Sequence, residues 1–255
     1  MFLPYNVDVP MERLPIANWL LIGATVITSA SLWFVSASEV VRRGQLLDDE
    51  QTRMPAWTDM GIHRGGKLAF SQLLTHTLVH AGIVHLIGNM IFLFCFGNAV
   101  NAKIGQLQYL LLYAAMSIAA GVVWLALGRG KVAVGASGAV MGITGVYVVL
   151  YPRNYVTVLW RFGMNAGVTE IAGGWVVLCE ILFNLLGWLL PFGNVAHEAH
   201  LGGMFTGMAT GVVLVYTGLV KSTSYEENLL QWLGLQPRTK QRARRRRKRR
   251  VQQEE

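Results

Sequence analysis

Residues 135–145 read Gly-Ala-Ser-Gly-Ala-Val-Met-Gly-Ile-Thr-Gly, with one serine between glycines at the start of a long apolar run. On a helix, Gly138, Gly142 and Gly145 fall within about 60° of one another, because successive residues are about 100° apart. Small residues at this spacing let two membrane helices approach closely. The stretch therefore predicts a helix that begins near Ser137 and packs a glycine face against a neighbour.

A second glycine stripe lies near the end of the apolar sequence. Its members share one face of the helix expected there: His200, Gly203, Gly207 and Gly211. Packing of one glycine face on the other would bring Ser137 close to His200, with both residues near the same ends of their helices. We expect this helix pair to form the centre of the protein.

The overall composition is that of a membrane protein. Hydrophobic residues make up 53% of the 255 residues and charged residues only 14%, against about 25% charged in soluble domains. A helix that crosses a bilayer needs about 20 apolar residues and pairs its backbone groups internally. Six segments qualify, at roughly 16–37, 73–96, 107–127, 135–151, 171–190 and 197–219. These segments predict an all-α membrane protein with six transmembrane helices.

The same segments predict how the chain is divided. We expect a short head over residues 1–15, one membrane domain over 16–220 and a tail over 221–255. The first apolar segment has an alternative interpretation as a cleaved signal peptide, with small residues at Ser36-Ala37-Ser38. Its apolar stretch exceeds the usual core of about 7–15 residues, and only Arg13 precedes it as a basic residue, so we expect a retained helix.

Basic residues are concentrated in the tail. Eleven of the 22 Lys and Arg residues lie after residue 220, and residues 242–250 are almost all basic. Because Lys and Arg favour the cytoplasmic side, this distribution predicts a cytoplasmic C-terminus, and an even number of spans then predicts a cytoplasmic N-terminus in a plasma or inner membrane. We expect the tail to contact anionic lipid. No aromatic residue interrupts the arginines, so a nucleic-acid partner is not expected.

Polar side chains in the predicted second helix each suggest a functional or packing role, because they are costly in a bilayer. His85 and Asn89 are four residues apart and project from one helix face, so they could point at a common oxygen or, alternatively, hold neighbouring helices. His76 and His80 have the spacing of a zinc-binding pair, but no third ligand lies nearby. We therefore expect no metal at this pair.

The predicted pair of Ser137 and His200 is suited to nucleophilic catalysis. A serine hydroxyl is a weak nucleophile until an adjacent base accepts its proton, and a histidine can then return that proton to a leaving amine. A tetrahedral intermediate also needs hydrogen-bond donors for its oxyanion. The N–H of Ser137, at the start of its helix, could donate to that oxyanion together with Asn89 and His85.

Three further polar residues are candidates for the site: His197, Glu198 and Glu180. His197 competes with His200 as the base, but it lies about 60° from the glycine face. Glu198 is about 200° from His200 around the helix, so the pair is expected to lack a carboxylate. Glu180, in the fifth helix, could share a proton with Asn184, as a neutral structural glutamate or as part of a gate.

Three motifs in this order resemble the rhomboid family of intramembrane serine proteases, over roughly residues 70–220. They are His85-x-x-x-Asn89, Gly135-Ala136-Ser137-Gly138 and Ala199-His200-Leu201-Gly202-Gly203. The Tyr151-Pro152-Arg153 stop is also similar to that family. Each motif is weak alone, whereas the three together on the expected helices are highly specific.

The resemblance implies that Ser137 is the nucleophile, His200 the general base and His85 with Asn89 the lining of the oxyanion hole. It also implies that Gly135 supports the loop before the serine and that His80 steadies the first long loop. Gly138 and Gly203 are supporting residues of the helix pair.

The resemblance further implies that the substrates are single-pass membrane proteins, which are cut near the outer leaflet without a metal or nucleotide, and that the fifth helix acts as a lateral gate. Many members carry a Trp-Arg pair in the first loop, and residues 38–72 contain none. The sequence therefore does not indicate which residues anchor that loop. A relative that only binds helices is the alternative function, and the presence of both Ser137 and His200 favours an enzyme. A channel is disfavoured because Glu180 is alone at mid-span.

Overall fold

The computed structural model describes residues 2–44, 59–66, 68–190, 193, 195–223 and 226–237. Its longer helices are α1 (Ile16–Gly44), α3 (Ile83–Phe92), α4 (Asn98–Ile104), α5 (Gln106–Leu127), α6 (Ser137–Leu150), α7 (Gly173–Leu189) and α8 (His197–Tyr216). The π-helical turn η3 (Leu93–Gly97) joins α3 to α4, so the three form one continuous helical segment. Short helices are α2 (Gln72–Thr75), η2 (His76–Leu78) and α9 (Leu229–Trp232).

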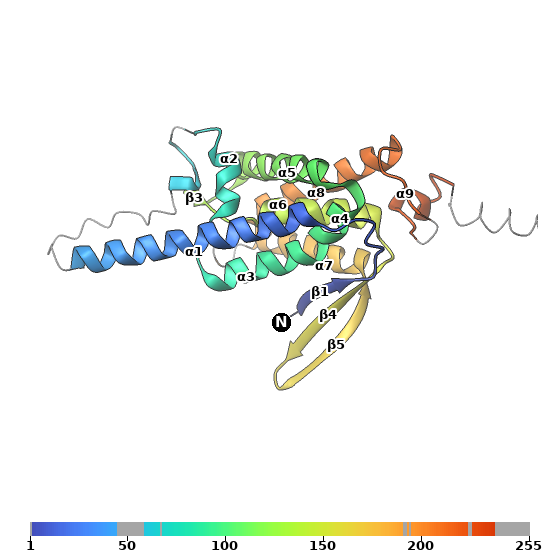
Figure 1. Cartoon of the computed structure of the whole chain (residues 1–255), viewed down its shortest axis with the longest axis horizontal. Helices are drawn as coiled ribbons and strands as arrows, with labels where there is room; N and C mark the ends of the chain where they lie inside the picture. The colour runs from blue at the N-terminus through green and yellow to red at the C-terminus, as the bar shows by residue number, and fades with distance from the viewer. Residues whose placement is uncertain are drawn as a thin grey trace, which may run out of the picture.

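The glycine stripes of α6 and α8 pack on each other at the centre of the molecule (Figure 1). A methyl group added at Gly203 would overlap the carbonyl oxygen of Gly138, and one added at Gly207 would overlap that of Gly142. The two backbones are therefore in direct contact, as the spacing predicted. Every residue of α6 from Gly138 to Leu150 is buried, which makes α6 the central helix of the bundle.

The number of membrane spans is only partly settled by helix length. Four helical segments are long and apolar enough to cross a membrane, namely Ile16–Ser36, Ile83–Ile104, Gln106–Leu127 and His197–Tyr216. The other two expected segments are shorter apolar helices, α6 with 14 residues and α7 with 17 residues. Each of the six predicted segments thus contains a helix, but length and composition support four full spans among the described residues.

The second predicted segment has different ends from those expected. Its first part, which we expected to be helical from residue 73, forms only the short turns α2 and η2, and the long helix begins at Ile83. The residues between the second and third predicted segments, expected to lie outside the spans, are also helical up to Ile104. The break lies at Gly105, whose φ of 95° ends one helix before α5 begins. Glycine is favoured there because other residues rarely adopt this conformation.

The expectation of an all-α protein is wrong for the connection after α6. Residues Tyr155–Phe162 form strand β4, which pairs in antiparallel fashion with β5 (Asn165–Ala172) and with β1 (Phe2–Val7) from the head. Figure 1 shows this sheet projecting away from the helices. Val156 and Val158 are buried at alternate positions of β4, the period of a strand with one covered face. The hairpin turns at Gly163, with a φ of 60°.

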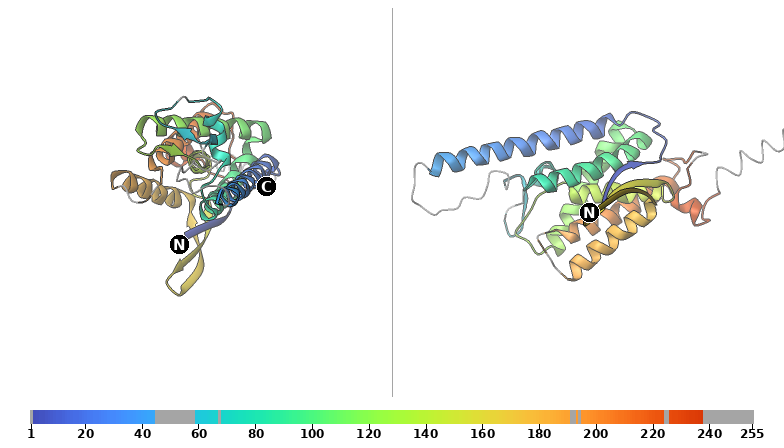
Figure 2. Two further views of the ribbon diagram at one scale, coloured as in Figure 1. Left: turned by 90° about the vertical axis from the view of Figure 1, so that its left-hand side faces the viewer. Right: turned by 90° about the horizontal axis from the view of Figure 1, so that it is seen from below.

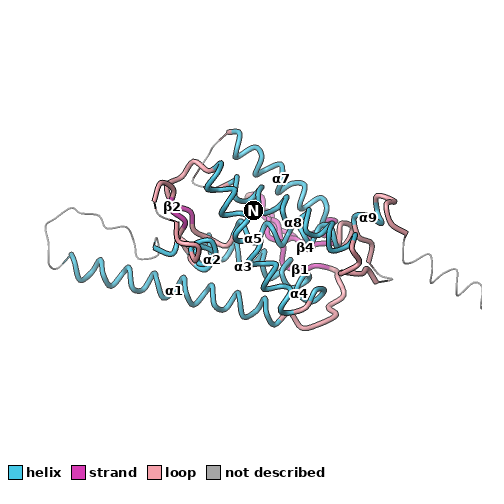
Figure 3. Tube along the Cα trace, turned by 90° about the horizontal axis from the view of Figure 1, so that it is seen from above, coloured by secondary structure: helices cyan, strands magenta, loops and turns pink. Residues whose placement is uncertain are grey.

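Helices α1 and α7 lie on opposite sides of the bundle (Figures 2 and 3). Their outer faces carry large apolar side chains, including Phe34, which is 77% exposed, and Trp175, which is 64% exposed. Apolar groups in such number on the outside are expected of a surface that meets lipid. The basic run at residues 242–250 and most of the connection after α1 lie outside the described residues.

Candidate active site

Ser137 is the first residue of α6, and the loop before it is held by two backbone hydrogen bonds. The Gly135 N–H donates to the His76 carbonyl oxygen (2.9 Å), and the Ala136 N–H donates to His80 Nε2 (3.2 Å). Gly135 has a φ of 119°, and a Cβ there would lie 2.6 Å from Cε1 of His85. Both the conformation and the contact therefore require glycine at this position.

His80 connects this loop to the first helix. Because its Nε2 accepts from Ala136, its Nδ1 carries the hydrogen and donates to Ser29 Oγ (3.2 Å), which in turn donates to the Leu78 carbonyl oxygen (3.1 Å). His80 precedes the spanning helix and is fully buried. Burial, with a smaller contribution from His85, lowers the pKa of His80 from 6.5 to about 3. The ring therefore stays neutral and keeps its acceptor.

The two histidines at the start of α8 share one partner on α7. Nδ1 of His200 lies 2.8 Å from Oδ1 of Asn184, and Nδ1 of His197 lies 3.0 Å from the same oxygen. The His197 ring also packs against Gly187 of α7, where any added Cβ would overlap it. His197 is thus turned toward α7. This placement favours His200, rather than His197, as the residue available to Ser137.

Ser137 and His200 come from neighbouring, tightly packed backbones. A Cβ at Gly138 would lie 3.4 Å from the carbonyl oxygen of Ala199. Among the described residues, no hydrogen bond joins the Ser137 hydroxyl to His200. Hydrogen bonds between catalytic groups are often long before substrate binds, so the packing brings the two residues to the same region without fixing their contact.

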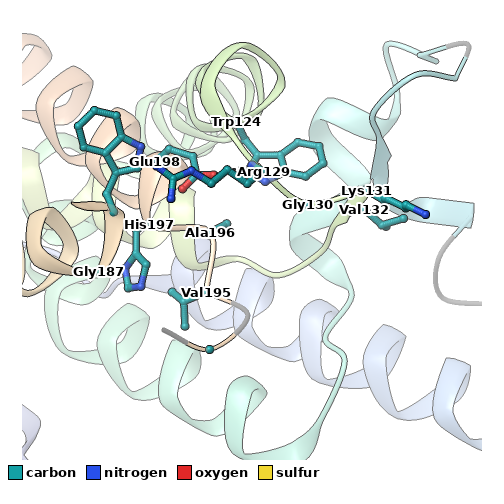
Figure 4. A pocket seen from close by; sticks show the side chains of 12 residues that line it. Trp124, Arg129, Gly130, Lys131, Val132, Gly187, Val195, Ala196, His197 and Glu198 are labelled. Carbon is teal, nitrogen blue, oxygen red and sulfur yellow. Dashed lines mark hydrogen bonds between the residues drawn. The ribbon is translucent and has the colours of Figure 1, made fainter. Parts of the chain in front are cut away.

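Glu198 points away from this pair, as its position around the helix predicted. Its Oε1 accepts from the Arg129 N–H (3.1 Å) in the turn between α5 and α6. Arg129, His197 and Glu198 line a cavity of about 420 Å³ (Figure 4). The figure shows the His197 and Arg129 side chains entering it from separate segments. The cavity is also lined by Gly130, Lys131 and Val132 from the loop that precedes Ser137.

Asn89 is buried, at 9% exposure, and its Nδ2 has no hydrogen-bond partner within the described part of the chain. A buried amide N–H without a partner costs about 1–3 kcal/mol. The hydroxyls of Tyr147 and Tyr151 are likewise buried without a partner among the described residues, so what distinguishes Asn89 is its place on the same helix face as His85. His85, four residues earlier on α3, has an exposed side chain.

The first connection is anchored by a residue that sequence reasoning did not single out. The Arg64 guanidinium donates to the Trp124 carbonyl oxygen (2.5 Å) and lies 5.2 Å from the centroid of the Trp124 ring. Strand β2 (Ile62–His63) also pairs with β3 (Val132–Ala133), in the loop before Ser137. These contacts supply the anchoring that the missing Trp-Arg pair left open.

Asn184 is the second residue whose contacts were not anticipated. Its Nδ2 donates to the backbone carbonyl oxygen of Glu180 (2.8 Å). Asn184 therefore contacts the backbone of Glu180 and not its carboxyl group, with which the sequence suggested a shared proton. The spacing of four residues was visible in the sequence. The sequence of α7 alone does not reveal how that helix is rotated against α8.

Comparison with known proteins agrees with these features. The Rhomboid domain family matches residues 67–217. Rhomboid-like protein 11, chloroplastic, from Arabidopsis thaliana is 35% identical over 156 residues, covering 58% of this chain and 52% of that protein. RHOMBOID-like protein 6, mitochondrial, from the same organism is 26% identical over 144 residues, covering 56% and 43%.

A bacterial relative, Rhomboid protease GluP from Bacillus subtilis (strain 168), is 29% identical over 159 residues, covering 62% of this chain and 28% of that protein. The chain therefore spans about half or less of the length of these relatives. The family match extends over more than half of the chain, from the first connection to the end of α8. We conclude that this multi-pass integral membrane protein belongs to the rhomboid family.

Proposed function

We propose that the protein is an intramembrane serine endopeptidase that cleaves transmembrane segments of single-pass membrane proteins through an acyl-enzyme. The observation that carries this proposal is the α6–α8 contact, which places Ser137 and His200 at neighbouring helix starts. The similarity to Rhomboid protease GluP of Bacillus subtilis supports it.

In the first half of the reaction, the Ser137 oxygen attacks the scissile carbonyl carbon, and His200 Nε2 takes the hydroxyl proton. The new C–O bond turns the carbonyl into an oxyanion. The Ser137 N–H, which has no partner within its helix, and the unpartnered Asn89 Nδ2 donate to that oxyanion, with His85 as a further donor. His200 then protonates the amine as the C–N bond breaks, which leaves an ester on Ser137.

In the second half, a water molecule replaces the amine. His200 takes a proton from the water, whose oxygen attacks the ester carbonyl, and the same donors stabilise the second oxyanion. Collapse of this intermediate releases a carboxylic acid and returns the proton to the Ser137 oxygen. One water molecule is consumed in each turnover, and Ser137 and His200 return to their starting protonation states.

The substrate class is inferred from the position of the proposed pair. Ser137 and His200 lie at the starts of α6 and α8, in a bundle whose outer helices α1 and α7 carry large exposed apolar side chains. We infer that the peptide bonds that reach this site are those of membrane-embedded segments. We infer cytoplasmic termini in a plasma or inner membrane from the basic tail, which would contact anionic lipid. A lateral opening at α7, on the edge of the bundle, is the proposed entry path.

The test compares the full-length wild type with Ser137→Ala and His200→Ala in proteoliposomes. A fluorophosphonate probe should label only the wild type strongly, because it reacts with an activated serine. Equal labelling of all three proteins would show that Ser137 and His200 are not the nucleophile and its base. Cleavage of a single-pass substrate that disappears in Ser137→Ala separates an enzyme from a protein that only binds helices.

A further inference from the structure

We propose that Asn184, on α7, is a positioning residue that fixes the tautomer and orientation of the His200 base. The site is then a Ser-His-Asn arrangement in which the third member is neutral and comes from a different helix. This inference rests on the proposed function, because it gives His200 the role of base. It adds a residue that neither the motifs nor the helix-face argument assigned.

The first step is the orientation of the Asn184 amide, whose oxygen and nitrogen have similar shapes. The atom 2.8 Å from the Glu180 backbone oxygen must be the amide nitrogen, because a carbonyl oxygen can only accept. The amide oxygen then faces α8. Since that oxygen can also only accept, the ring nitrogens beside it on His197 and His200 must both be donors.

The second step is the consequence for His200. A neutral imidazole carries one hydrogen, and Asn184 holds it on Nδ1. The lone pair is therefore on Nε2, where it can accept the Ser137 proton. In the other tautomer, Nε2 would carry the hydrogen and the lone pair of Nδ1 would face the Asn184 oxygen, so the base would be blocked and a hydrogen bond lost.

The third step is the environment of this contact. Asn184 is 3% exposed, and its amide is tied to α7 through the Glu180 carbonyl. One carbonyl oxygen has two lone pairs, which His197 and His200 can occupy together. His197 thereby helps to hold the amide in one orientation. This arrangement explains why a second buried histidine lies one helical turn from the base.

A neutral third member also predicts how a charged one would behave. In Asn184→Asp, a carboxylate would lie beside the His200 ring and stabilise its protonated form. Because only the neutral ring accepts a proton from serine, activity in that variant should fall off at a higher pH than in the wild type. An acid limb that stays where the wild type has it would show that residue 184 does not contact the His200 ring.

The experiment measures kcat, KM and the pH profile of substrate cleavage by the full chain in proteoliposomes. Asn184→Ala should lower kcat by about 10- to 100-fold, as expected for loss of a buried hydrogen bond, with KM within about twofold. Asn184→Asp should retain more activity, with its acid limb moved to higher pH. Leu185→Ala, at a 39% exposed neighbour on α7, is the matched control and should resemble the wild type.

A second measurement does not depend on activity. Nitrogen-15 NMR of histidine-labelled protein should show His200 protonated on Nδ1 in the wild type and a mixture of tautomers in Asn184→Ala, with His200→Gln used for assignment. Wild-type kcat and pH profile in Asn184→Ala, or an Nε2-protonated His200 in the wild type, would overturn the inference. If the wild type cleaves no faster than Ser137→Ala, the proposed function has failed, and the NMR result still decides the tautomer.

Discussion

Two buried asparagines, Asn18 and Asn89, show how differently two regions of the bundle use the same side chain. Asn18 joins α1 to α4 and α5: its Nδ2 donates to Leu93 O (2.9 Å) and Asn98 Oδ1 (2.8 Å), and its Oδ1 accepts from the Tyr109 hydroxyl (2.5 Å). The Asn89 Nδ2 has no such partner in the described residues.

The difference in pairing indicates that Asn18 belongs to the scaffold of the bundle and Asn89 to the candidate active site. A fully paired amide in an apolar setting holds three helices in one arrangement, and loss of any partner leaves another group unpaired. An unpaired buried amide costs stability, but it keeps a donor free for a charge that appears only during a reaction. The two regions should therefore respond in opposite ways to the same substitution.

The largest expected effect is on catalysis, in Asn89→Ala. Loss of one oxyanion donor typically lowers kcat about 100- to 1000-fold, and removal of an unpaired amide should leave thermal stability unchanged or slightly higher. Single-turnover cleavage and thermal unfolding in detergent give the two values. Cleavage as fast as in the wild type would remove Asn89 from the oxyanion hole.

Asn18→Ala should show the reverse pattern. It strands the Leu93 carbonyl, Asn98 and the Tyr109 hydroxyl, so we expect a loss of about 2–4 kcal/mol in the free energy of unfolding. Cleavage per folded molecule should change only a few-fold. A larger loss of activity than of stability would contradict the division between scaffold and site.

Acidic pH should also weaken the loop before Ser137, by roughly 1 kcal/mol over the first pH unit below 6.5. Burial lowers the pKa of His80 to about 3, below its ordinary 6.5, so the unfolded chain binds the proton first. Stability from this group is complete above pH 6.5 and falls by roughly 1 kcal/mol per pH unit below it, until the pH approaches 3. His80→Gln, which cannot titrate, should flatten the pH dependence of thermal unfolding; an unchanged slope would contradict a neutral, loop-holding His80.

The smallest effect is expected at the anchor of the first connection. Arg64→Lys keeps the charge but loses the planar group that donates to the Trp124 and Leu125 carbonyl oxygens. We expect about 1 kcal/mol less local stability, seen as faster amide exchange in residues 62–63 and 132–133, with cleavage within threefold. Exchange as slow as in the wild type would show that strand pairing alone holds this connection.

Glycine spacing was enough to predict the central helix pair, because close backbone approach leaves few alternatives to glycine. The angular positions of residues around these two helices also predicted that Ser137 and His200 lie at the same end of the pair and that Glu198 points away from them. The start of the second helix could not be predicted in this way. The apolar residues from 73 to 82 suggest a continuous helix, whereas the backbone at Gly82 is extended and the long helix begins after it.

Contacts between elements that are far apart in the chain could not be predicted from the sequence. The pairing of β4 with β1 joins residues about 150 positions apart, and no local pattern in the head indicates it. Likewise, the role of Asn184 depends on the rotation of α7 against α8, and the role of Arg64 depends on the fold of the whole first connection.

The shortness of α6 has a thermodynamic consequence. Its 14 residues rise only about 21 Å, less than the hydrocarbon thickness of about 30 Å, so its ends cannot reach both bilayer surfaces. The unpaired N–H groups at its first turn would each cost several kcal/mol in contact with lipid. Hydrogen bonds to His76 and His80 hold the loop before this end, so we expect the loop to keep lipid away from those N–H groups.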